Sequence, residues 1–249
     1  MTETITSPHN EKLKLVRRLA DRRQREREGL FVTEGEDLLA AALAAGHEPA
    51  ELLVAPGADV TGAAEHGAVA VERELLDSVS VLGSGTRAIA IWPIPAAAPP
   101  AGGACVFLDA VGDPGNVGTI VRTAVALCAA SVVAGPGSAD PYSPKAVRAS
   151  MGALFARPPL SGELAATPEP RLGLVARGGG DLDAAIEAAR PRTLCLGAER
   201  EGLSEAVLAG CEATATIPVL PGAESLNVAA SAAIALHRIS SSAGGGGDR

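Results

Sequence analysis

Aromatic residues are scarce in this sequence, and long apolar runs are missing. The 249 residues include one Trp, one Tyr and three Phe, 2% of the chain, although 47% of the residues are hydrophobic. We therefore expect a core built from Ala, Val, Leu and Ile, and few side chains on which a nucleic-acid base could stack. No apolar run is long enough to span a membrane, and the first residues lack the apolar segment of a signal peptide. These absences favour a soluble, cytoplasmic protein.

The cysteines and histidines are few and form no pattern typical of a metal site. Four of each are scattered along the chain, and no two cysteines form a C-x-x-C pair. Each cysteine lies in an apolar stretch or a helix, so small, free, buried thiols are predicted. The histidines lack the spacing of zinc ligands, and we expect no metal.

Positive charge is concentrated in one segment near the start of the sequence. The whole chain carries a formal charge of −8, which by itself argues against a nucleic-acid partner. Between Lys12 and Arg27, however, eight basic side chains face only Asp21 and Glu26. Concentrated positive charge suits contacts with phosphates, and Arg17, Arg18, Arg22 and Arg23 are the predicted RNA contacts of this segment. The alternative interpretation is a solvated helix face.

The pattern of apolar residues predicts two domains. A basic amphipathic helix is expected over 11–27, followed by strands at 30–33, 51–55, 68–71 and 88–92 and helices at 36–45 and 73–80. Together they form a first α/β domain over residues 1–95. The Pro- and Gly-rich residues 96–103 have no periodicity and read as a linker. The Gly-rich tail at 241–249 is expected to be disordered.

After the linker, short apolar strands alternate regularly with helices. Strands are predicted at 104–110, 131–135, 171–177, 193–197 and 213–218, with helices at 116–129, 144–155, 181–189, 203–210 and 225–239. Strands that are apolar throughout and alternate with helices indicate a mostly parallel sheet covered on both faces. The second domain, residues 104–240, is therefore predicted to be α/β.

Three segments of this second domain carry polar side chains that a simple connection would not need. They span residues 109–122, 196–204 and 217–228, and each joins a strand end to a helix start through a turn that contains Gly or Pro. In open α/β sheets, ligands bind beyond the carboxyl ends of the strands, where all three segments are expected. None contains a Walker lysine, a G-x-G-x-x-G pattern or a Ser-His-Asp set, which argues against nucleotide hydrolysis and covalent hydrolysis.

Each polar residue in these segments also has a purely structural interpretation. Asn116 could cap the helix that follows it, with Arg122 an ordinary surface residue, and Glu199 could simply open a helix. Ser225 could be a helix N-cap. Asn227 is harder to explain in this way, because Asn is a poor residue for a helix interior.

In order and spacing, the three segments resemble the motifs of the SpoU (TrmH-like) RNA 2′-O-ribose methyltransferases of the SPOUT superfamily. Asn116 and Arg122 match the first motif, Glu199 the second, and Ser225 with Asn227 the third. The resemblance covers about residues 104–240. It extends more loosely to Thr6–Asn10 and Phe31–Gly35, which are similar to the substrate-binding domain often attached to these enzymes.

This resemblance implies a fold, a cofactor and a set of functional residues. The implied fold is an α/β domain with a deep trefoil knot, preceded by an L30e-like α/β domain, in an obligate homodimer. The implied catalytic residues are Arg122, Asn116, Glu199, Ser225 and Asn227. S-adenosylmethionine is expected to contact Leu196, Gly197, Ala198, Ile217, Pro218, Val219, Ser225, Leu226 and Asn227.

The implied reaction is attack of a ribose 2′-hydroxyl on the methyl group of a sulfonium, which mainly requires alignment and a proton acceptor. A guanidinium rarely gives up its proton, so we assign Arg122 to binding phosphate and positioning the hydroxyl, with Asn116, Glu199 and Asn227 orienting it. The favoured substrate is 23S ribosomal RNA, because folded RNA is recognised by charge, shape and the 2′-hydroxyl rather than by stacking alone. Transfer RNA and a non-catalytic RNA- or ribosome-binding role stay open, as does an antibiotic-resistance role against a housekeeping one.

Overall fold

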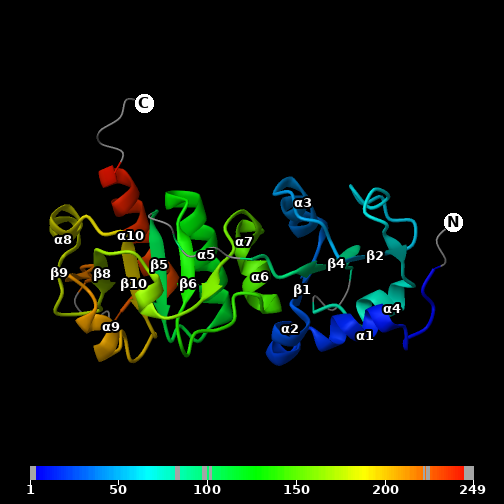
Figure 1. The fold of residues 1–249 in the computed structure, drawn as a ribbon, viewed down its shortest axis with the longest axis horizontal. Coiled ribbons are helices and arrows are strands. Elements are labelled where there is room, and N and C mark those ends of the chain that lie inside the picture. The colour runs from blue at the N-terminus through cyan, green and yellow to red at the C-terminus, as the bar shows by residue number, and fades with distance from the viewer. Residues whose placement is uncertain are drawn as a thin grey trace. The chain divides into compact units, whose positions relative to one another are not determined.

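The computed structural model describes residues 4–81, 85–96, 100, 103–220, 222 and 225–243. The chain forms two compact units (Figure 1). Residues 1–95 and 142–156 make up the first, and residues 96–141 and 157–249 the second. Most of the predicted linker 96–103 and residues 244–249 of the predicted tail lie outside the described residues.

The first unit is a four-stranded mixed sheet with helices packed against it. Its strands lie in the order β1-β4-β2-β3, with β2 and β3 parallel and the other pairs antiparallel. The strands are β1 (Leu30–Glu34), β2 (Glu51–Val54), β3 (Val69–Ala70) and β4 (Ala88–Pro93). The helices are α1 (Glu11–Arg18), α2 (Arg22–Glu28), α3 (Glu36–Ala44), α4 (Arg73–Asp77), α6 (Pro144–Ser150) and α7 (Ala153–Ala156).

The prediction of one continuous basic helix over 11–27 is wrong. The chain forms two helices, because the side chain of Asp21 accepts a hydrogen bond from the backbone N–H of Gln24 at 3.2 Å and caps a new helix, α2. Arg25 is buried, and its Nη1 donates to the backbone oxygens of Leu19 and Ala20 at 2.7 and 2.8 Å. This arginine therefore holds the corner between the helices.

Aromatic side chains pack the segment that contains α6 and α7 against the sheet of the first unit. The ring of Phe31 on β1 lies 5.1 Å from that of Tyr142 and 5.6 Å from that of Phe155, measured between centroids. Trp92 on β4 contacts Phe155 edge-on at 5.1 Å, and its Nε1 donates to Thr33. All five aromatic residues of the chain are buried. None of them offers an exposed ring to a base.

The single helix predicted at 144–155 is two helices. Met151 and Gly152 both have positive φ, which ends α6 before α7 begins. Gly152 also lies so close to α3 that an added Cβ would be 2.4 Å from the Cβ of Ala41. Glycine is required here by conformation and by space together.

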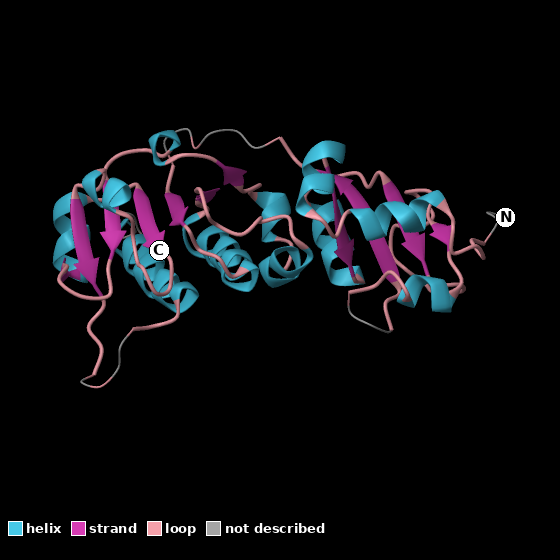
Figure 2. Cartoon of the chain, turned by 90° about the horizontal axis from the view of Figure 1, so that it is seen from below, coloured by secondary structure: helices cyan, strands magenta, loops and turns pink. Residues whose placement is uncertain are grey.

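The second unit is a parallel sheet with helices packed against it (Figure 2). Its seven strands lie in the order β7-β6-β5-β10-β8-β11-β9. Its strands are β5 (Cys105–Asp109), β6 (Ser131–Ala134), β7 (Leu160–Ser161), β8 (Arg171–Leu174), β9 (Gly180–Asp181), β10 (Thr193–Gly197) and β11 (Ala213–Thr216). Its helices are α5 (Pro114–Cys128), α8 (Leu182–Ala189), α9 (Glu205–Ala209) and α10 (Val228–Ala243), with a 3₁₀ turn at Leu164–Ala166. The prediction of a mostly parallel α/β sheet is confirmed.

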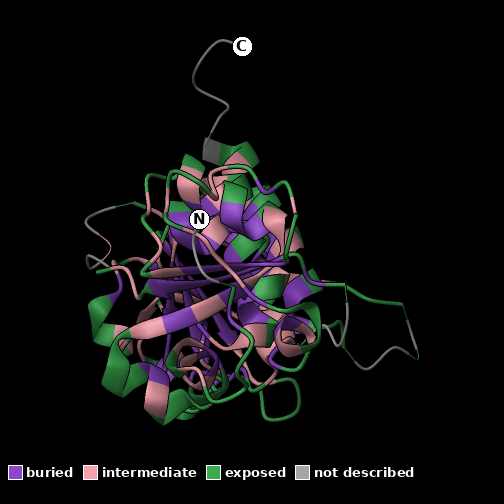
Figure 3. Ribbon diagram, turned by 90° about the vertical axis from the view of Figure 1, so that its right-hand side faces the viewer, coloured by how far each residue is buried: buried purple, intermediate pink, exposed green. Residues whose placement is uncertain are grey.

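Burial of the central strands follows from their composition. Every residue of β5 and all but the last of β10 are buried, as expected for a parallel sheet covered on both faces. Buried backbone, drawn in purple, is concentrated in the interior of the molecule and exposed backbone at its outside (Figure 3). The thiols of Cys105 and Cys195 lie in this core, and burial raises the pKa of Cys105 to about 12. Such a thiol stays protonated and unreactive near neutral pH.

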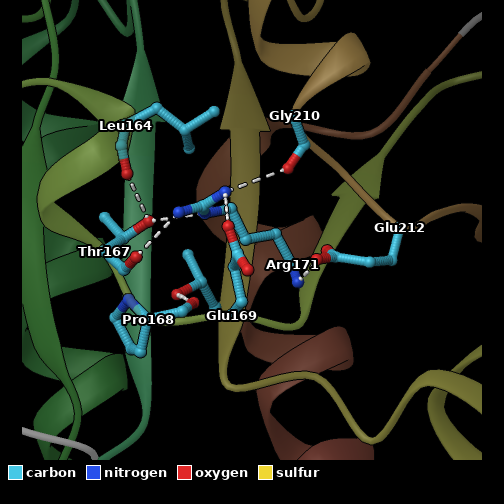
Figure 4. Close-up of polar contacts among 8 residues, drawn as sticks. Leu164, Thr167, Pro168, Glu169, Arg171, Gly210 and Glu212 are labelled. Carbon is cyan, nitrogen blue, oxygen red and sulfur yellow. Dashed lines mark hydrogen bonds and ion pairs between the residues drawn. The ribbon is translucent and has the colours of Figure 1, made fainter.

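At the amino ends of the strands, opposite the three motifs, a buried arginine bonds to several neighbouring segments. Arg171, the first residue of β8, donates through Nε and Nη2 to Thr167 at 3.1 and 2.9 Å (Figure 4). Its Nη1 reaches Glu169 at 2.9 Å and the backbone oxygen of Gly210 at 3.3 Å, while its backbone N–H donates to Glu212. Arg171 therefore has a structural role, as it lies far along the strand from the carboxyl ends.

Candidate active site

The three motifs meet at one edge of the parallel sheet. They follow β5, β10 and β11, and β5 and β10 are neighbours in the sheet with Asp109 opposite Gly197. The chain proceeds from β5 to β6 and β7 on one side, and returns to place β10, β8 and β11 on the other. Such a reversal of strand order leaves a crevice beyond the carboxyl ends, where ligands bind in α/β proteins.

The first motif begins α5, but Asn116 does not cap it. The side chain of Asp113 accepts from the backbone N–H of Asn116 at 3.0 Å, and Pro114 occupies the first helical position. The interpretation of Asn116 as the N-cap is therefore wrong. Because Asp113 performs that task, the amide of Asn116 is available for another contact, and its Nδ2 donates to Oε1 of Glu199 at 2.5 Å.

The second motif is a tight turn after β10. Ala198 and Gly202 exchange backbone hydrogen bonds of 3.1 and 2.9 Å, and an added Cβ on Gly197 would be 2.1 Å from the carbonyl carbon of Gly202. Buried Asp109, at the end of β5, accepts from the backbone N–H of Ser204 at 2.7 Å. This bond fixes the turn to the neighbouring strand and sets the position of Glu199.

The third motif begins α10, and its cap is Asn227 rather than Ser225. The side-chain oxygen of Asn227 accepts from the backbone N–H groups of Ala229 and Ala230 at 2.9 and 3.3 Å. The predicted helix start at 225 is therefore wrong, since α10 begins at Val228. Ser225 precedes the helix and lines a cavity described below.

Asn116, Glu199 and Asn227 form a single hydrogen-bonded cluster, one residue from each motif. Nδ2 of Asn227 donates to Oδ1 of Asn116 at 3.1 Å and to Oε1 of Glu199 at 3.4 Å, which completes the triangle. Glu199 and Asn227 are exposed and Asn116 is half-buried. The cluster therefore presents fixed amide and carboxylate groups to a ligand.

Arg122 lies apart from this cluster. It is exposed on α5, six residues after Asn116, which puts it roughly 120° around the helix from that residue. Within the part of the chain that the structure describes, its guanidinium makes no hydrogen bond or ion pair. Its predicted orientation by Asn116, Glu199 and Asn227 stays a prediction.

A cavity of about 310 Å³ opens beside the cluster. Seven of the predicted cofactor contacts line it: Leu196, Gly197, Ala198, Ile217, Val219, Ser225 and Leu226. Pro218 and Asn227 are not among its lining residues. Sequence reasoning missed the contributions of Arg200, Glu201 and the end of β8, although the motif order points to neighbouring strand ends as the place to look.

The four predicted RNA contacts of the basic segment are exposed in the first unit. Arg17 and Arg18 end α1, and Arg22 and Arg23 begin α2. Arg17 donates to the backbone oxygen of Pro8 at 3.0 Å and to Ser78 at 3.3 Å, and Arg22 pairs with Glu26 at 2.8 Å. Part of the charge is therefore already paired within the unit.

Two further findings apply to the described residues only. They contain no group of three or more His, Cys, Asp or Glu side chains that could hold a metal ion. They also contain no helix that is both long enough and apolar enough to cross a bilayer.

The fold and the site together define a methyltransferase of the kind seen in two solved structures. The SpoU methyltransferase AviRb from Streptomyces viridochromogenes, in complex with AdoMet, covers 96% of this chain and 100% of its own at 26% identity, with a TM-score of 0.85. An AdoMet-bound rRNA methyltransferase from Sinorhizobium meliloti covers 96% and 97% at 27% identity, with a TM-score of 0.83.

The chain belongs to the SpoU rRNA methylase family, whose model matches residues 103–237. Residues 10–90 match the MRM3-like substrate binding domain. The 23S rRNA (guanosine(2553)-2′-O)-methyltransferase RlmP of Bacillus subtilis is 28% identical over 94% of this chain and 98% of its own length. An uncharacterized tRNA/rRNA methyltransferase of Synechocystis is 31% identical over 94% and 92%.

Proposed function

We propose that the protein is an S-adenosylmethionine-dependent RNA 2′-O-ribose methyltransferase that acts on 23S ribosomal RNA. The observation that carries the proposal is the Asn116–Glu199–Asn227 cluster, which joins the three motifs beside a cavity at the carboxyl ends of β5 and β10. The names of relatives such as RlmP, which acts on 23S rRNA, support the choice of substrate.

The residues around the cavity fit S-adenosylmethionine. Its walls include aliphatic side chains such as Leu196, Ile217 and Leu226, which suit an adenine ring, and the backbone of the tight turn at 197–202. The carboxylates of Glu199 and Glu201 line it against the single guanidinium of Arg200, a balance that suits a cationic ligand. When bound there, the cofactor would supply an electrophilic methyl group.

The residues of the chain would align the ribose and accept a hydrogen bond from it. Oε1 of Glu199 already receives two N–H groups, from Asn116 and Asn227, so its carboxylate is held in one orientation and can accept a hydrogen bond from the ribose through Oε2. Ser225, which lines the cavity, would form a second hydrogen bond to the ribose. Arg122 would bind the phosphate next to the reacting ribose, because its guanidinium is permanently charged and bidentate.

The assembly and the domain roles are further parts of the proposal. We propose that residues 1–95 bind RNA and that 104–240 form the methyltransferase domain with the trefoil knot, as matches at 10–90 and 103–237 support. A homodimer is supported by Leu127 on α5 and Ile234 on α10, which are 37% and 41% exposed on two helices that pack together. A cytoplasmic location is consistent with ribosomal RNA as substrate.

The proposal is tested by methyl transfer with the purified chain. Radiolabelled S-adenosylmethionine and ribosomal RNA are incubated with wild type and with Arg122→Ala, and cofactor affinity is measured by calorimetry. We expect Arg122→Ala to lose at least about 100-fold in turnover with cofactor affinity nearly unchanged, because its partner is the RNA.

The matched control is Arg157→Ala, which removes an exposed arginine from the same unit outside the three motifs. It should transfer methyl groups at the wild-type rate. Equal turnover of Arg122→Ala and wild type would make Arg122 an ordinary surface residue. Transfer to tRNA in place of ribosomal RNA would contradict the proposed substrate, and cofactor binding without transfer to either would favour a non-catalytic RNA-binding role.

A further inference from the structure

A second cavity lies within the first unit, away from the candidate active site. Its volume is about 230 Å³, below the roughly 300–1,000 Å³ typical of sites for drug-sized ligands, so it suits one small group. It is formed by α1 and the turn after it, by β1, by α3, by the segment after α4, and by α6. Residues from α6 are more than sixty positions from the others in sequence, and no sequence motif marks the site.

The walls of this cavity are aliphatic. Val16, Val32, Leu38, Val79 and Val147 contribute to them. Val81, which also lines the cavity, is 60% exposed and is a large apolar side chain left open to solvent. A flat apolar ring placed here would cover aliphatic surface and gain the corresponding hydrophobic free energy.

Two guanidiniums border the same cavity. Arg17 is held in place by its bonds to the backbone oxygen of Pro8 and to Ser78, and these use two of its five N–H groups. Arg148 on α6 is exposed, and its guanidinium makes no hydrogen bond or ion pair within the described part of the chain. One fixed and one unengaged guanidinium at the border of an apolar cavity are complementary to a ring that carries a phosphate.

A carboxylate that is fixed by hydrogen bonds within the first unit also lines the cavity. Glu34 on β1 accepts from the hydroxyl of Ser80 through Oε2 and from the backbone N–H of Val81 through Oε1, each at 2.7 Å. The hydroxyl of buried Thr86 also donates to Oε2 at 3.5 Å. These bonds fix the carboxylate at the border of the cavity.

We propose that this cavity holds the base of one unstacked ribonucleotide of the RNA substrate. The base lies against the aliphatic walls, and the phosphate of the same nucleotide binds Arg17 and Arg148 at the border of the cavity. This inference rests on the proposed function in taking RNA as the substrate. It gives a chain without exposed aromatic rings a way to bind a splayed base, which is how proteins recognise sequence in single-stranded RNA.

The test is a titration of the full ¹⁵N-labelled chain with guanosine 5′-monophosphate, followed by NMR. S-adenosylhomocysteine is present at saturation to occupy the other cavity. We expect saturable shifts of the backbone amides of Ser78–Val81, Val147 and Arg148. Arg148→Ala should weaken this binding at least about fivefold, the effect of losing one charge-assisted contact. Ala20→Trp, which adds bulk at an exposed position lining the cavity, should abolish the shifts.

Arg73→Ala is the matched control, because it removes an exposed arginine from α4 of the same unit without touching the cavity. It should bind like wild type. The proposal is overturned if no cavity amide shifts, if Arg148→Ala and Arg73→Ala behave alike, or if inorganic phosphate gives the same shifts at the same concentration. The titration involves no methyl transfer, so the two proposals can fail separately. An active enzyme that shows no shifts contradicts this inference alone. A protein that binds the nucleotide but transfers no methyl group contradicts only the proposed function.

Discussion

At the scale of single residues, Asn227 combines a structural task with a functional one. Its side-chain oxygen caps α10, while its Nδ2 donates to Asn116 and Glu199. The capping contribution belongs to folding and is typically about 0.5–2 kcal/mol. The donated bonds belong to the orientation of the candidate active site. Two substitutions separate these contributions.

Asn227→Asp keeps an oxygen that can cap α10 but removes the N–H donors and adds negative charge beside Glu199. We expect the free energy of unfolding to stay within about 0.5 kcal/mol of wild type and methyl transfer to fall at least about tenfold. Asn227→Ala should lose both, with about 1 kcal/mol of stability. Chemical denaturation and initial rates provide the two readouts. Full activity of Asn227→Asp would mean that Asn227 serves only as a cap.

The residue scale is also where sequence reasoning fell short. Asp113 and Asn116 are both good capping residues, and only the geometry around Pro114 at the first helical position decides for Asp113. Ser225 and Asn227 are likewise both good capping residues, and only the structure shows that Asn227 caps α10. Residue types and motif order identified the three side chains that meet, but which atom donates to which depends on tertiary contacts that spacing does not encode.

At the scale of elements, the corner between α1 and α2 divides the basic segment. The run of arginines favours one long helix, since Arg is a good helix former, and this hid the capping role of Asp21. Asp21 and buried Arg25 turn the chain, so Arg17 and Arg18 lie at the end of one helix and Arg22 and Arg23 at the start of the next. RNA contact by these four residues stays a prediction.

Changing Arg17, Arg18, Arg22 and Arg23 together to Ala should weaken RNA binding and flatten its dependence on salt. Each lost phosphate contact lowers the slope of log affinity against log salt concentration by roughly one unit. Since Arg22 also pairs with Glu26, its loss should contribute less. The measurement is RNA affinity at several salt concentrations, with cofactor affinity as the control for folding. If the plots of log affinity against log salt concentration coincide for the variant and wild type, these four arginines form only a solvated surface.

The elements of the second unit were more predictable than their connections. Strands such as β5 and β10 are apolar throughout because both faces of the sheet are covered, and this composition is visible in the sequence. The strands β7 and β9 have two residues each and leave no periodic signal. The order β7-β6-β5-β10-β8-β11-β9 depends on crossovers, which periodicity does not determine.

At the scale of the whole molecule, sequence position and spatial grouping differ. Residues 142–156 fall inside the range of the methylase family model but group with the first unit. Contacts of Tyr142 and Phe155 with Phe31 and Trp92 account for this grouping. Four of the five aromatic residues pack against one another in the core of the first unit. They are therefore not available to stack on RNA bases.

Methylation of a ribose 2′-hydroxyl in ribosomal RNA by this chain can be tested in cells. The experiment maps 2′-O-methyl sites in the RNA of cells that contain the wild-type protein, the Arg122→Ala protein or neither. We predict one site in 23S ribosomal RNA that is methylated only with the wild-type protein. Identical maps in all three cells, or a site that persists with Arg122→Ala, would contradict the proposed reaction or the role of Arg122 in it.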